Sequence, residues 1–456
     1  MDKIINLRHM HQKEHLQENK PPGSSVTGIR KIIVVGLALF WVMIIVAFHH
    51  HFQLWHSQHF SVTAFLSLPF GYLLFKIILS FFYHPIDVPV LTGEDAFPFT
   101  ISAVMPCYKE SPESVMNAIE SLLAQTYPIK EIFFVDDGTP MDDDDPKQSA
   151  YEAVVAFINR YNGHYHGTRL VAHRLPENQG KIYAQTWGFQ YATGDLIMTV
   201  DSDGMIKIDG VEELVKVFAN DDKVGSAVGY VAARNVADSF IATVQDINYS
   251  GAFSVGRAAQ SVLNCVVVCS GALSLHRRTV VIEHLDEYLD ETALGINLRS
   301  GDDRRLTRIS KKSGWKTKYQ STAICYTEVP NRGQKFVRQR VRWTRSAWLG
   351  SIQNFGKVSW KYLNYILFSF MESYLWLITL ILWFLFSRNV ELSLEFWIHA
   401  AIYYVLMNYL GTVYYIFHKP IRYLLSPIFS LFYGLALIWI YIKTMLFLFN
   451  SKWGTR

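Results

Sequence analysis

The feature that most constrains this chain is the uneven placement of its charged residues along the sequence. Five runs are almost free of charge and flank a central segment of ordinary polarity. Each run is near the ~20 residues that an α-helix needs to span a hydrocarbon core. This pattern predicts a membrane protein in which a soluble domain separates N-terminal from C-terminal membrane segments. The runs lie at residues 32–48, 60–83, 365–386, 396–417 and 423–449.

The composition agrees with this division. Charged residues make up 18% of the chain and hydrophobic residues 50%, whereas ordinary soluble domains have about a quarter charged residues. The net charge of +4 is too small to indicate nucleic-acid binding. The four cysteines lack the spacing of a zinc site. We expect Cys265 and Cys269 to pack as small apolar residues in a reducing compartment.

Basic residues orient the predicted membrane segments. The polar tail at 1–29 contains several of them, and Arg30 and Lys31 adjoin the first run. The loop at 49–59 is rich in His and has no Lys or Arg. The positive-inside rule places the tail in the cytoplasm and the loop outside, so two spans at 30–83 return the chain to the cytoplasm. The His residues could hold a metal ion, but a solvated loop is the simpler interpretation.

The C-terminal segment at 363–450 poses a problem of parity. Its last apolar run has basic flanks at 418–422 and 451–456, and both flanks should face the cytoplasm. The run is too short for two full crossings at about 1.5 Å per residue. We therefore expect that this run is broken near Pro427 and lies partly re-entrant or interfacial, or that a kinked extra crossing exists.

The segment at 97–330 predicts an α/β domain. Short apolar runs alternate with stretches of helical length, which is typical of a mainly parallel sheet. Three of the predicted strands end in the polar sequences PCYKE, DDG and DSD, and ligands bind at this edge of such sheets. The sequence has neither a GxGxxG fingerprint nor a P-loop motif. Strands are expected at 99–105, 131–135, 169–173 and 196–200, and helices at 112–124, 150–161 and 181–192.

Asp201 and Asp203 follow the last of these strands with one residue between them. Carboxylates at this spacing suit Mg²⁺ or Mn²⁺, whose remaining ligands would be phosphate oxygens and water. Such an ion would stabilise a departing nucleoside diphosphate. Acidic turns are also common on protein surfaces, and we interpret the acidic run at 142–145 as a solvated loop.

Two further acids, Asp302 and Asp303, occur in the sequence SGDDRRLT. A carboxylate here could act as the general base that accepts a proton from an attacking hydroxyl. The same residues could equally cap a helix N-terminus and interact with its dipole. The octapeptide alone supports both interpretations.

The stretch at 331–362 is basic and amphipathic and contains QRVRW at 339–343. Residues 339, 342 and 343 lie on one helical face. Arg342 could neutralise a diphosphate, Gln339 could hold it by hydrogen bonds, and Trp343 could offer a flat ring to a sugar. Interfacial helices with Arg and Trp at the lipid headgroups would account for the same residues, and both interpretations can be true.

Taken together, PCYKE, VDDG, NQGK, DSD, SGDDRRLT and QRVRW resemble the processive, membrane-embedded family 2 glycosyltransferases. RAAQS at 257–261, VCSGALS at 268–274 and the terminal WGTR narrow the resemblance to the bacterial hyaluronan synthases. It covers the chain from Ile32 onward. It implies an α/β glycosyltransferase A-type domain that faces the cytoplasm, inserted between α-helical transmembrane segments of a multi-pass plasma-membrane protein.

The resemblance also implies an activity. Such an enzyme polymerises hyaluronan processively from UDP-GlcNAc and UDP-GlcUA, with inversion, and uses Mg²⁺ or Mn²⁺. It exports the growing polysaccharide through its own membrane channel. The expected partners are the two donors, the polymer and membrane lipids, with no nucleic acid and no obligatory protein partner.

Site residues follow from the resemblance by matching positions. On the nucleotide side it implies that Tyr108 packs on the uracil near Glu110, that Asp136 and Asp137 lie at the base or ribose, and that Lys181 approaches the nucleotide-sugar. It implies that Asp201 contacts the nucleotide and Asp203 the metal. Gly204 departs from the Thr or Ser expected after DSD.

The remaining roles concern catalysis and the acceptor. The resemblance makes Asp303, in preference to Asp302, the general base. It implies that Gln339 and Arg342 bind the diphosphate and that Trp343 lines the acceptor site. The small residues Cys269, Ser270, Gly271 and Ala272 would lie beside the acceptor, and Trp453 and Arg456 of the 451–456 tail would gate the bound nucleotide.

Other functions share part of this pattern. A chitin-oligosaccharide synthase shares RAAQS and the acid-Asp-Arg-x-Leu-Thr pattern, but WGTR and the GDD sequence favour hyaluronan. A synthase of another capsule or cellulose-like polysaccharide is a third candidate. A membrane transporter or inactive scaffold is remote, because the charged motifs lie in the soluble domain and not within the apolar runs.

Overall fold

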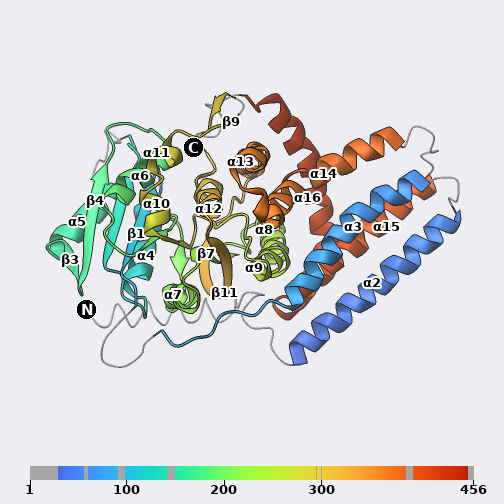
Figure 1. Ribbon diagram of the computed structural model, residues 1–456, viewed down its shortest axis with the longest axis horizontal. Coiled ribbons are helices and arrows are strands. Elements are labelled where there is room, and N and C mark those ends of the chain that lie inside the picture. The colour runs from blue at the N-terminus through green and yellow to red at the C-terminus, as the bar shows by residue number, and fades with distance from the viewer. Residues whose placement is uncertain are drawn as a thin grey trace.

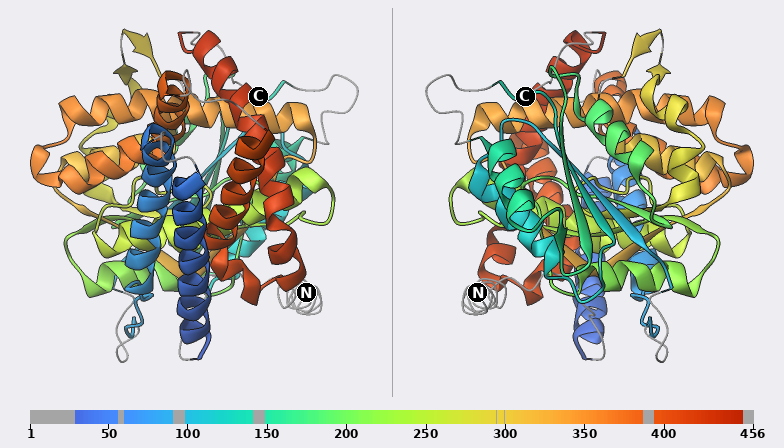
Figure 2. Two further views of the ribbon diagram at one scale, coloured as in Figure 1. Left: turned by 90° about the vertical axis from the view of Figure 1, so that its right-hand side faces the viewer. Right: turned by 90° about the vertical axis from the view of Figure 1, so that its left-hand side faces the viewer.

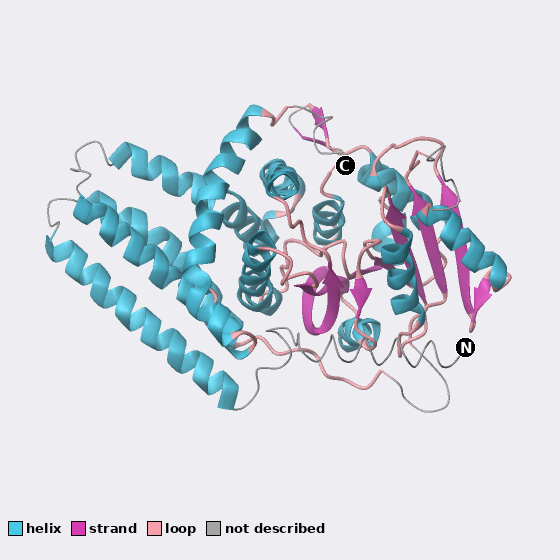
Figure 3. Cartoon of the chain, turned by 180° about the vertical axis from the view of Figure 1, so that it is seen from behind, coloured by secondary structure: helices cyan, strands magenta, loops and turns pink. Residues whose placement is uncertain are grey.

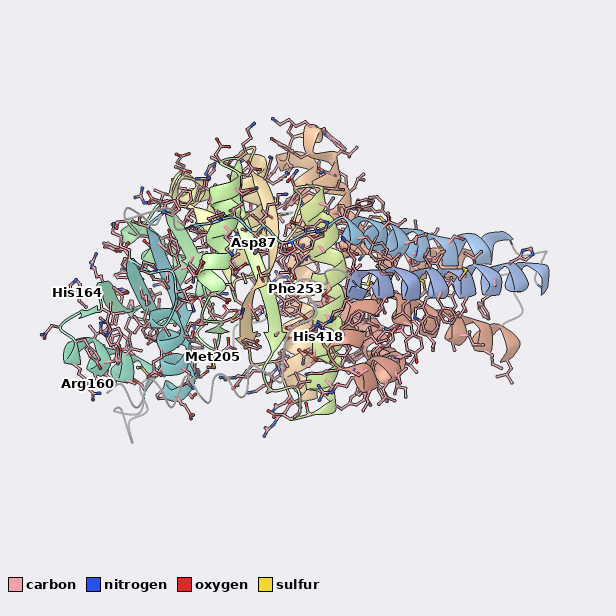
Figure 4. All side chains as sticks on the ribbon, turned by 90° about the horizontal axis from the view of Figure 1, so that it is seen from below. Asp87, Arg160, His164, Met205, Phe253 and His418 are labelled. Carbon is pink, nitrogen blue, oxygen red and sulfur yellow. The ribbon has the colours of Figure 1, made fainter. Side chains whose placement is uncertain are left out.

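A computed structural model gives the fold of residues 29–55, 60–90, 98–140, 149–293, 295–298, 300–386 and 394–449. A sheet covered by helices forms one end of the molecule, and long helices extend from the other end (Figure 1). Phe253 and His418 lie where the two parts meet (Figure 4). The polar tail, the acidic run at 142–145 and the WGTR tail lie outside the described residues.

One mixed sheet forms the core of the α/β part. Its order in the described residues is β3-β4-β2-β1-β5-β8-β7-β11-β6. The strands are β1 (Ile101–Cys107), β2 (Glu131–Asp136), β3 (His164–Tyr165), β4 (Thr168–Arg174), β5 (Leu196–Thr199), β6 (Met205–Ile206), β7 (Val224–Ala233), β8 (Ser274–Arg277) and β11 (Lys316–Thr327). Two short strands, β9 (Thr292–Ala293) and β10 (Ile296–Asn297), pair separately.

The expected, mainly parallel arrangement is confirmed, because β4, β2, β1, β5, β7 and β11 all run in one direction, and β3, β8 and β6 run in the other. Strands β4, β2, β1 and β5 are parallel, and all four lie close to the predicted positions. By contrast, β8 is antiparallel to both β5 and β7. Ser274 at the start of β8 pairs with Thr199 at the end of β5, so the chain enters β8 from the carboxyl edge of the parallel strands. The sequence has no signal for this reversal.

The central strands are buried on both faces. In β1, Ala103 and Met105 pack into one hydrophobic cluster, whereas Val104 packs into the other. This alternation with a period of two is what a strand covered on both sides requires. Figure 3 shows the strands between layers of helices.

Helices cover the two faces of the sheet. One face is covered by α4 (Pro112–Leu123), α5 (Ala150–Arg160), α7 (Gly210–Asn220), α8 (Phe240–Gly251), the π-helix η3 (Ala252–Arg257) and α9 (Ala258–Val262). The other face is covered by α6 (Lys181–Tyr191), α10 (Arg278–Ile282), α11 (Leu285–Leu289) and α12 (Asp302–Lys312).

The long helices form the second part of the molecule. They are α2 (Ile29–Trp55), α3 (Phe60–Phe81), α13 (Gly333–Lys357), α14 (Leu363–Phe386), α15 (Leu394–Gly411) and α16 (Pro420–Leu446), with short helices η4 (Trp360–Tyr362) and η6 (Val413–Phe417). Helix α2 packs on α3 and α15, and α13 packs against α12, α14 and α16 (Figure 2). The predicted interfacial stretch at 331–362 is thus largely one long helix wedged between the sheet domain and the apolar helices.

Two helices of the described residues are long and apolar enough to cross a membrane, by length and composition. They comprise Arg30–Phe48 of α2 and Pro420–Leu446 of α16. Both expose large apolar side chains, among them Ile32 at 72% and Leu424 at 64%. Apolar surface of this extent indicates contact with lipid or another apolar partner.

The expected break near Pro427 is not present in the structure. Helix α16 continues through Pro427 from Pro420 to Leu446. Proline removes one backbone donor from the helix and usually kinks it. Here Tyr409 of α15 donates a hydrogen bond of 2.7 Å to the Leu424 carbonyl, in the turn before the proline. Packing against α15 therefore helps α16 to accommodate a residue that would weaken an isolated helix.

A buried ion-pair group fixes α12 to the segment before it. Arg305 is fully buried, and its Nε donates a hydrogen bond of 2.6 Å to the Glu291 carboxylate. Its other nitrogens donate to the carbonyls of Tyr288 and Leu298, and Arg308 also pairs with Glu291. One guanidinium thus joins α11 and the β9–β10 pair to the helix that begins with Asp302.

Replacing Arg305 with Met should destabilise the protein strongly. The change removes the hydrogen-bond donor of two backbone carbonyls, and it takes one of two positive partners away from the buried Glu291 carboxylate. We expect a loss of about 3 kcal/mol in the free energy of unfolding. Thermal unfolding of the purified protein in detergent measures this loss. Lys312→Met is the control, because the 2.8 Å pair between Lys312 and Glu287 is partly exposed and should contribute at most about 1 kcal/mol. Equal shifts for both variants would contradict the assignment.

Candidate active site

A cleft of about 510 Å³ lies at the carboxyl ends of the parallel strands. Its walls come from that sheet edge, the loop before β8, the start of α12, one face of α13, and Tyr433 of α16. The cleft thus reaches from the sheet to one of the long apolar helices. It brings together most residues singled out in the sequence: Tyr108, Asp137, Lys181, Asp201, Asp203, Ser270, Gly271, Asp302, Asp303, Gln339, Arg342 and Trp343.

The DDG and NQGK sequences form one hydrogen-bonded unit. The Asp137 carboxylate accepts hydrogen bonds from the backbone N–H groups of Gln179 (2.9 Å) and Gly180 (3.0 and 3.1 Å). The side-chain amide of Asn178 donates a further bond of 3.1 Å. These bonds fix the turn that leads into α6, whose first residue is Lys181.

Gly138 makes this close approach of two loops possible. Its φ is +61°, in the left-handed region that favours glycine. A Cβ atom there would lie 2.3 Å from the carbonyl carbon of Glu177. The glycine of the DDG sequence is therefore needed for contact between backbones, and the acid before it holds the second loop in place.

Lys181 pairs with two carboxylates from different elements. Its Nζ lies 2.7 Å from Asp201 Oδ1, at the end of β5, and 2.9 Å from Asp302 Oδ2, at the start of α12. Burial alone would lower the pKa of Lys181, but the charges of Asp201 and Asp302 outweigh it and raise this pKa well above its ordinary value. The lysine therefore stays charged and ties both acids to α6.

Asp203 is placed to hold a divalent cation. Burial, and then the charge of Asp201, raises the pKa of Asp203 to about 7. Its Oδ1 accepts a long hydrogen bond of 3.2 Å from the Thr327 hydroxyl, which compensates the carboxylate only weakly. A cation would relieve this, and one or two carboxylates with phosphate oxygens are a usual shell for Mg²⁺ or Mn²⁺. Because Asp201 already pairs with Lys181, Asp203 is the stronger candidate ligand, and the residues present fit the ion.

Asp302 and Asp303 have different surroundings although they are neighbours. Burial would raise the pKa of Asp302, but the pair with Lys181 outweighs this and lowers it. Burial and then the charge of Asp302 raise the pKa of Asp303 to about 6. Asp303 accepts a 2.7 Å bond from the Arg304 N–H, and Gly301 precedes the helix without any side-chain cap. Asp302 is thus occupied by an ion pair, and Asp303 is the acid better suited to accept a proton.

The QRVRW helix presents three expected residues to the cleft. Gln339, Arg342 and Trp343 all line it. Arg342 is close enough to Asp302 that its charge helps to lower the pKa of that acid. Helix α13 reaches this position because Gly301 allows α12 to approach it: a Cβ on Gly301 would lie 1.9 Å from Ser346 Oγ.

Gly271 and Gly204 lie beside the acids at positions where the structure leaves little room for a side chain. A Cβ on Gly271 would lie 2.8 Å from Lys181 Nζ and 3.3 Å from Asp302 Oδ2. The unexpected Gly204 is also packed closely, since a Cβ there would lie 3.1 Å from Cys325 Sγ and 3.2 Å from the Asp201 carbonyl oxygen. In this chain, the local packing leaves little room for Thr or Ser at position 204.

Some expected residues lie away from the cleft. Asp136 is buried and pairs with Arg174 at 2.7 Å and the Thr139 hydroxyl at 2.6 Å, so it supports the DDG turn from behind. Cys269 is fully buried, and its backbone N–H donates a hydrogen bond to the Thr307 hydroxyl. The next residues of its loop, Ser270 and Gly271, line the cleft. Glu110 is not among the lining residues. The expected roles of Trp453 and Arg456 fall outside the described residues.

The cleft also contains residues that the sequence interpretation passed over. Asn178 belongs to NQGK, and a search for polar neighbours of Lys181 would have found it. Arg340 could not be recognised as a site residue in the sequence because many basic residues surround it. Tyr433 could not be recognised because it lies within an apolar run. Further lining residues not singled out include Tyr249, Phe253, Arg257, Arg304, Thr327, Glu328 and Arg345.

Comparison with known sequences identifies relatives. The family model described as Glycosyl transferase family 2 matches residues 102–285. A hyaluronan synthase of Streptococcus pyogenes serotype M3 is 34% identical over 393 residues, which cover 84% of this chain and 88% of the relative. An N-acetylglucosaminyltransferase of Mesorhizobium japonicum is 30% identical over 300 residues, covering 65% of this chain and 68% of the relative.

Comparison with solved structures supports the fold. A mannosyltransferase from Pyrobaculum calidifontis, solved in complex with GDP-Man and Mn²⁺, superposes with a TM-score of 0.54 at 17% identity. The match covers 80% of this chain and 96% of the mannosyltransferase. At this level of identity the likeness concerns the arrangement of the chain, which is that of a glycosyltransferase A-type fold.

Replacing Gly271 with Ala should impair the site without unfolding the protein. The added methyl group would press on the flexible end of Lys181 and displace it from the acids, and small displacements of such groups can cost about 10²-fold in rate. The rate is measured as release of nucleoside diphosphate from UDP-sugars. Gly356→Ala in α13 is the control, because nothing lies within 4 Å of its added Cβ. A Gly271→Ala variant with the native rate would contradict the geometry.

Proposed function

The chain belongs to the hyaluronan synthase family of glycosyltransferases, and on this premise we propose that it polymerises hyaluronan from UDP-GlcNAc and UDP-GlcUA. It is a hexosyltransferase with a glycosyltransferase A-like fold. One observation carries the proposal: Asp303, the Lys181 ion-pair group and the QRVRW helix converge on one cleft at the carboxyl edge of the sheet. In the proposed reaction the enzyme acts processively and inverts the anomeric centre.

We assign the donor nucleotide to the sheet side of the cleft. Tyr108 offers a ring for the uracil at the end of β1, and Asp137 lies at the neighbouring strand end. Lys181 and Asp201 follow toward the centre of the cleft, where the diphosphate would lie. Because Asp137 already accepts several hydrogen bonds from the NQGK turn, its main contribution is to position that turn.

The diphosphate needs positive charge around it. Arg342 of α13 and Lys181 of α6 are two cations that line the cleft and act on the acids. Asp203, with Asp201 beside it, would hold Mg²⁺ or Mn²⁺, and the bound ion would supply charge to the departing UDP. Gln339 can hydrogen-bond a phosphate or sugar oxygen through its amide nitrogen.

Asp303 is the proposed general base. The acceptor hydroxyl loses its proton to the Asp303 carboxylate while its oxygen forms a bond to the anomeric carbon of the donor. The bond between that carbon and the diphosphate oxygen breaks, and UDP leaves with the electron pair. Asp302 stays ionised against Lys181, and burial together with this neighbouring charge keeps the pKa of Asp303 above its ordinary value.

The proposed path of the polymer leads toward the apolar helices. Tyr433, which lines the cleft, belongs to α16, one of the two helices long and apolar enough to span a membrane. This placement supports export of the polymer between the protein's own helices. We propose that the protein crosses the plasma membrane several times and that its catalytic domain faces the cytoplasm. The lipid bilayer is then its expected environment.

A second candidate function is synthesis of a chitin-like polymer of GlcNAc. The observation that favours it is the similarity to the N-acetylglucosaminyltransferase of Mesorhizobium japonicum. The relative named a hyaluronan synthase has higher identity and is covered over more of its length, so hyaluronan is the stronger proposal.

Omission of one donor at a time tests the choice of sugars. Membranes containing the protein receive UDP-GlcNAc, UDP-GlcUA or both, and polymer and released UDP are measured. We expect long polymer only with both donors, because each sugar must alternate with the other. Equal polymer from UDP-GlcNAc alone would replace the proposal with the chitin-like one. Membranes with Asp303→Asn provide the background.

The pH dependence of donor turnover tests the base. Asp303 accepts a proton only when it is ionised, and its pKa is raised to about 6. The native rate should therefore be level above this pH and fall about tenfold per pH unit below it. Asp303→Asn should reduce kcat at least about 10²-fold and abolish this limb of the profile. A variant that elongates polymer at the native rate would remove Asp303 from the role.

A further inference from the structure

Arg340 is a cleft residue to which the proposed reaction gives no role. It is the second residue of QRVRW, it lines the cleft, and it is 8% exposed. A guanidinium this deeply buried is normally paired with a carboxylate or fully hydrogen-bonded, because burying an uncompensated charge is costly.

Among the described residues, no acceptor compensates Arg340 fully. Its Nε and Nη2 are buried without a hydrogen-bond partner, and none of the ion pairs in this part of the chain includes it. The neighbouring Gln339 Oε1 is also buried without a donor. Two adjacent residues of α13 that line the cleft therefore have unpaired polar groups: Arg340 has N–H donors, and Gln339 has a carbonyl acceptor.

Aromatic rings take the place of a counter-ion around this guanidinium. Its central carbon lies 4.6 Å from the centroid of Trp343, 5.3 Å from Phe336, 5.4 Å from Tyr433 and 5.9 Å from Tyr249. The rings come from α13, α8 and α16. Cation–π contacts keep such a group charged but leave its N–H donors free.

The surroundings indicate what chemistry would complete the site. Trp343, Tyr249 and Tyr433 also line the cleft, and flat rings suit the faces of sugars. A partner must bring an anionic acceptor to Arg340 and a hydroxyl or amide donor to Gln339. A sugar that bears a carboxylate has both groups, whereas a neutral N-acetylated sugar lacks the anion.

We infer that Arg340, within its cage of Tyr249, Phe336, Trp343 and Tyr433, forms a subsite for the carboxylate of an acidic sugar in the growing chain. The inference rests on the proposed function, which supplies the glucuronate. The growing chain is favoured over the donor sugar because the cage includes Tyr433 of α16, on the side of the cleft toward the apolar helices. Arg342 and Lys181 remain for the diphosphate.

A binding measurement on the full-length purified protein tests the subsite. The probes are a hyaluronan hexasaccharide and the same hexasaccharide with its carboxyl groups methyl-esterified, and affinity is measured by calorimetry. The native protein should bind the acid about tenfold or more tightly than the ester, as expected for a charge-assisted hydrogen bond. Arg340→Gln should bind both equally, with its affinity for the ester unchanged, and Arg340→Lys should keep part of the preference.

Matched controls separate this effect from misfolding. Arg338→Gln removes an exposed arginine of the same helix and should keep the native preference. Thermal unfolding shows whether Arg340→Gln is folded; if it is not, the outcome with Arg340→Lys decides, and a Lys variant with undiminished preference counts against the subsite.

The remaining outcomes each decide the inference. Equal affinity of the native protein for acid and ester would overturn it, as would an unchanged preference in Arg340→Gln. A variant that alters only the KM for UDP-GlcUA would move the carboxylate to the donor site and also overturn it. Failure of the proposed function would appear separately, as polymer formed without UDP-GlcUA, because the binding assay requires no polymerisation.

Discussion

The ammonium group of Lys181, held between Asp201 and Asp302, is the interaction on which the rest of the cleft depends. The lysine begins α6, one acid follows β5, and the other begins α12, so a single cation joins three elements. Helix α12 in turn contacts α13 through Gly301. This charge group therefore links the sheet edge, through α12, to the QRVRW helix, and Gly271 leaves the space that the lysine occupies.

The same charge group gives neighbouring carboxylates different properties. The pair with the lysine lowers the pKa of Asp302, whereas burial and then the negative charge of Asp302 raise the pKa of Asp303. Burial and then the charge of Asp201 raise the pKa of Asp203 in the same way. An acid suited to accept a proton and an acid suited to hold a cation thus lie in one cleft.

The strands β4, β2, β1 and β5 could be predicted because the sequence features that indicate them are local. Apolar runs of strand length end at PCYKE, DDG and DSD, and parallel strands bring such ends to one edge. The antiparallel β8 could not be predicted, since its direction depends on the loop before it crossing the ligand-binding edge. The different roles of Asp136 and Asp137 also depend on tertiary contacts, because Asp136, the last residue of β2, pairs with Arg174, whereas Asp137, just after the strand, holds the NQGK turn.

By itself, the sequence determined the division into apolar and polar segments, the order of the motifs and the kind of chemistry that their side chains allow. These depend on residue types and short spacings. The tertiary structure alone decided which acid is paired with a lysine, why position 204 is a glycine, and that Tyr433 of an apolar helix meets Arg340 at the cleft. Those facts depend on contacts between residues far apart in the chain, and burial and neighbouring charge act only once the contacts have formed.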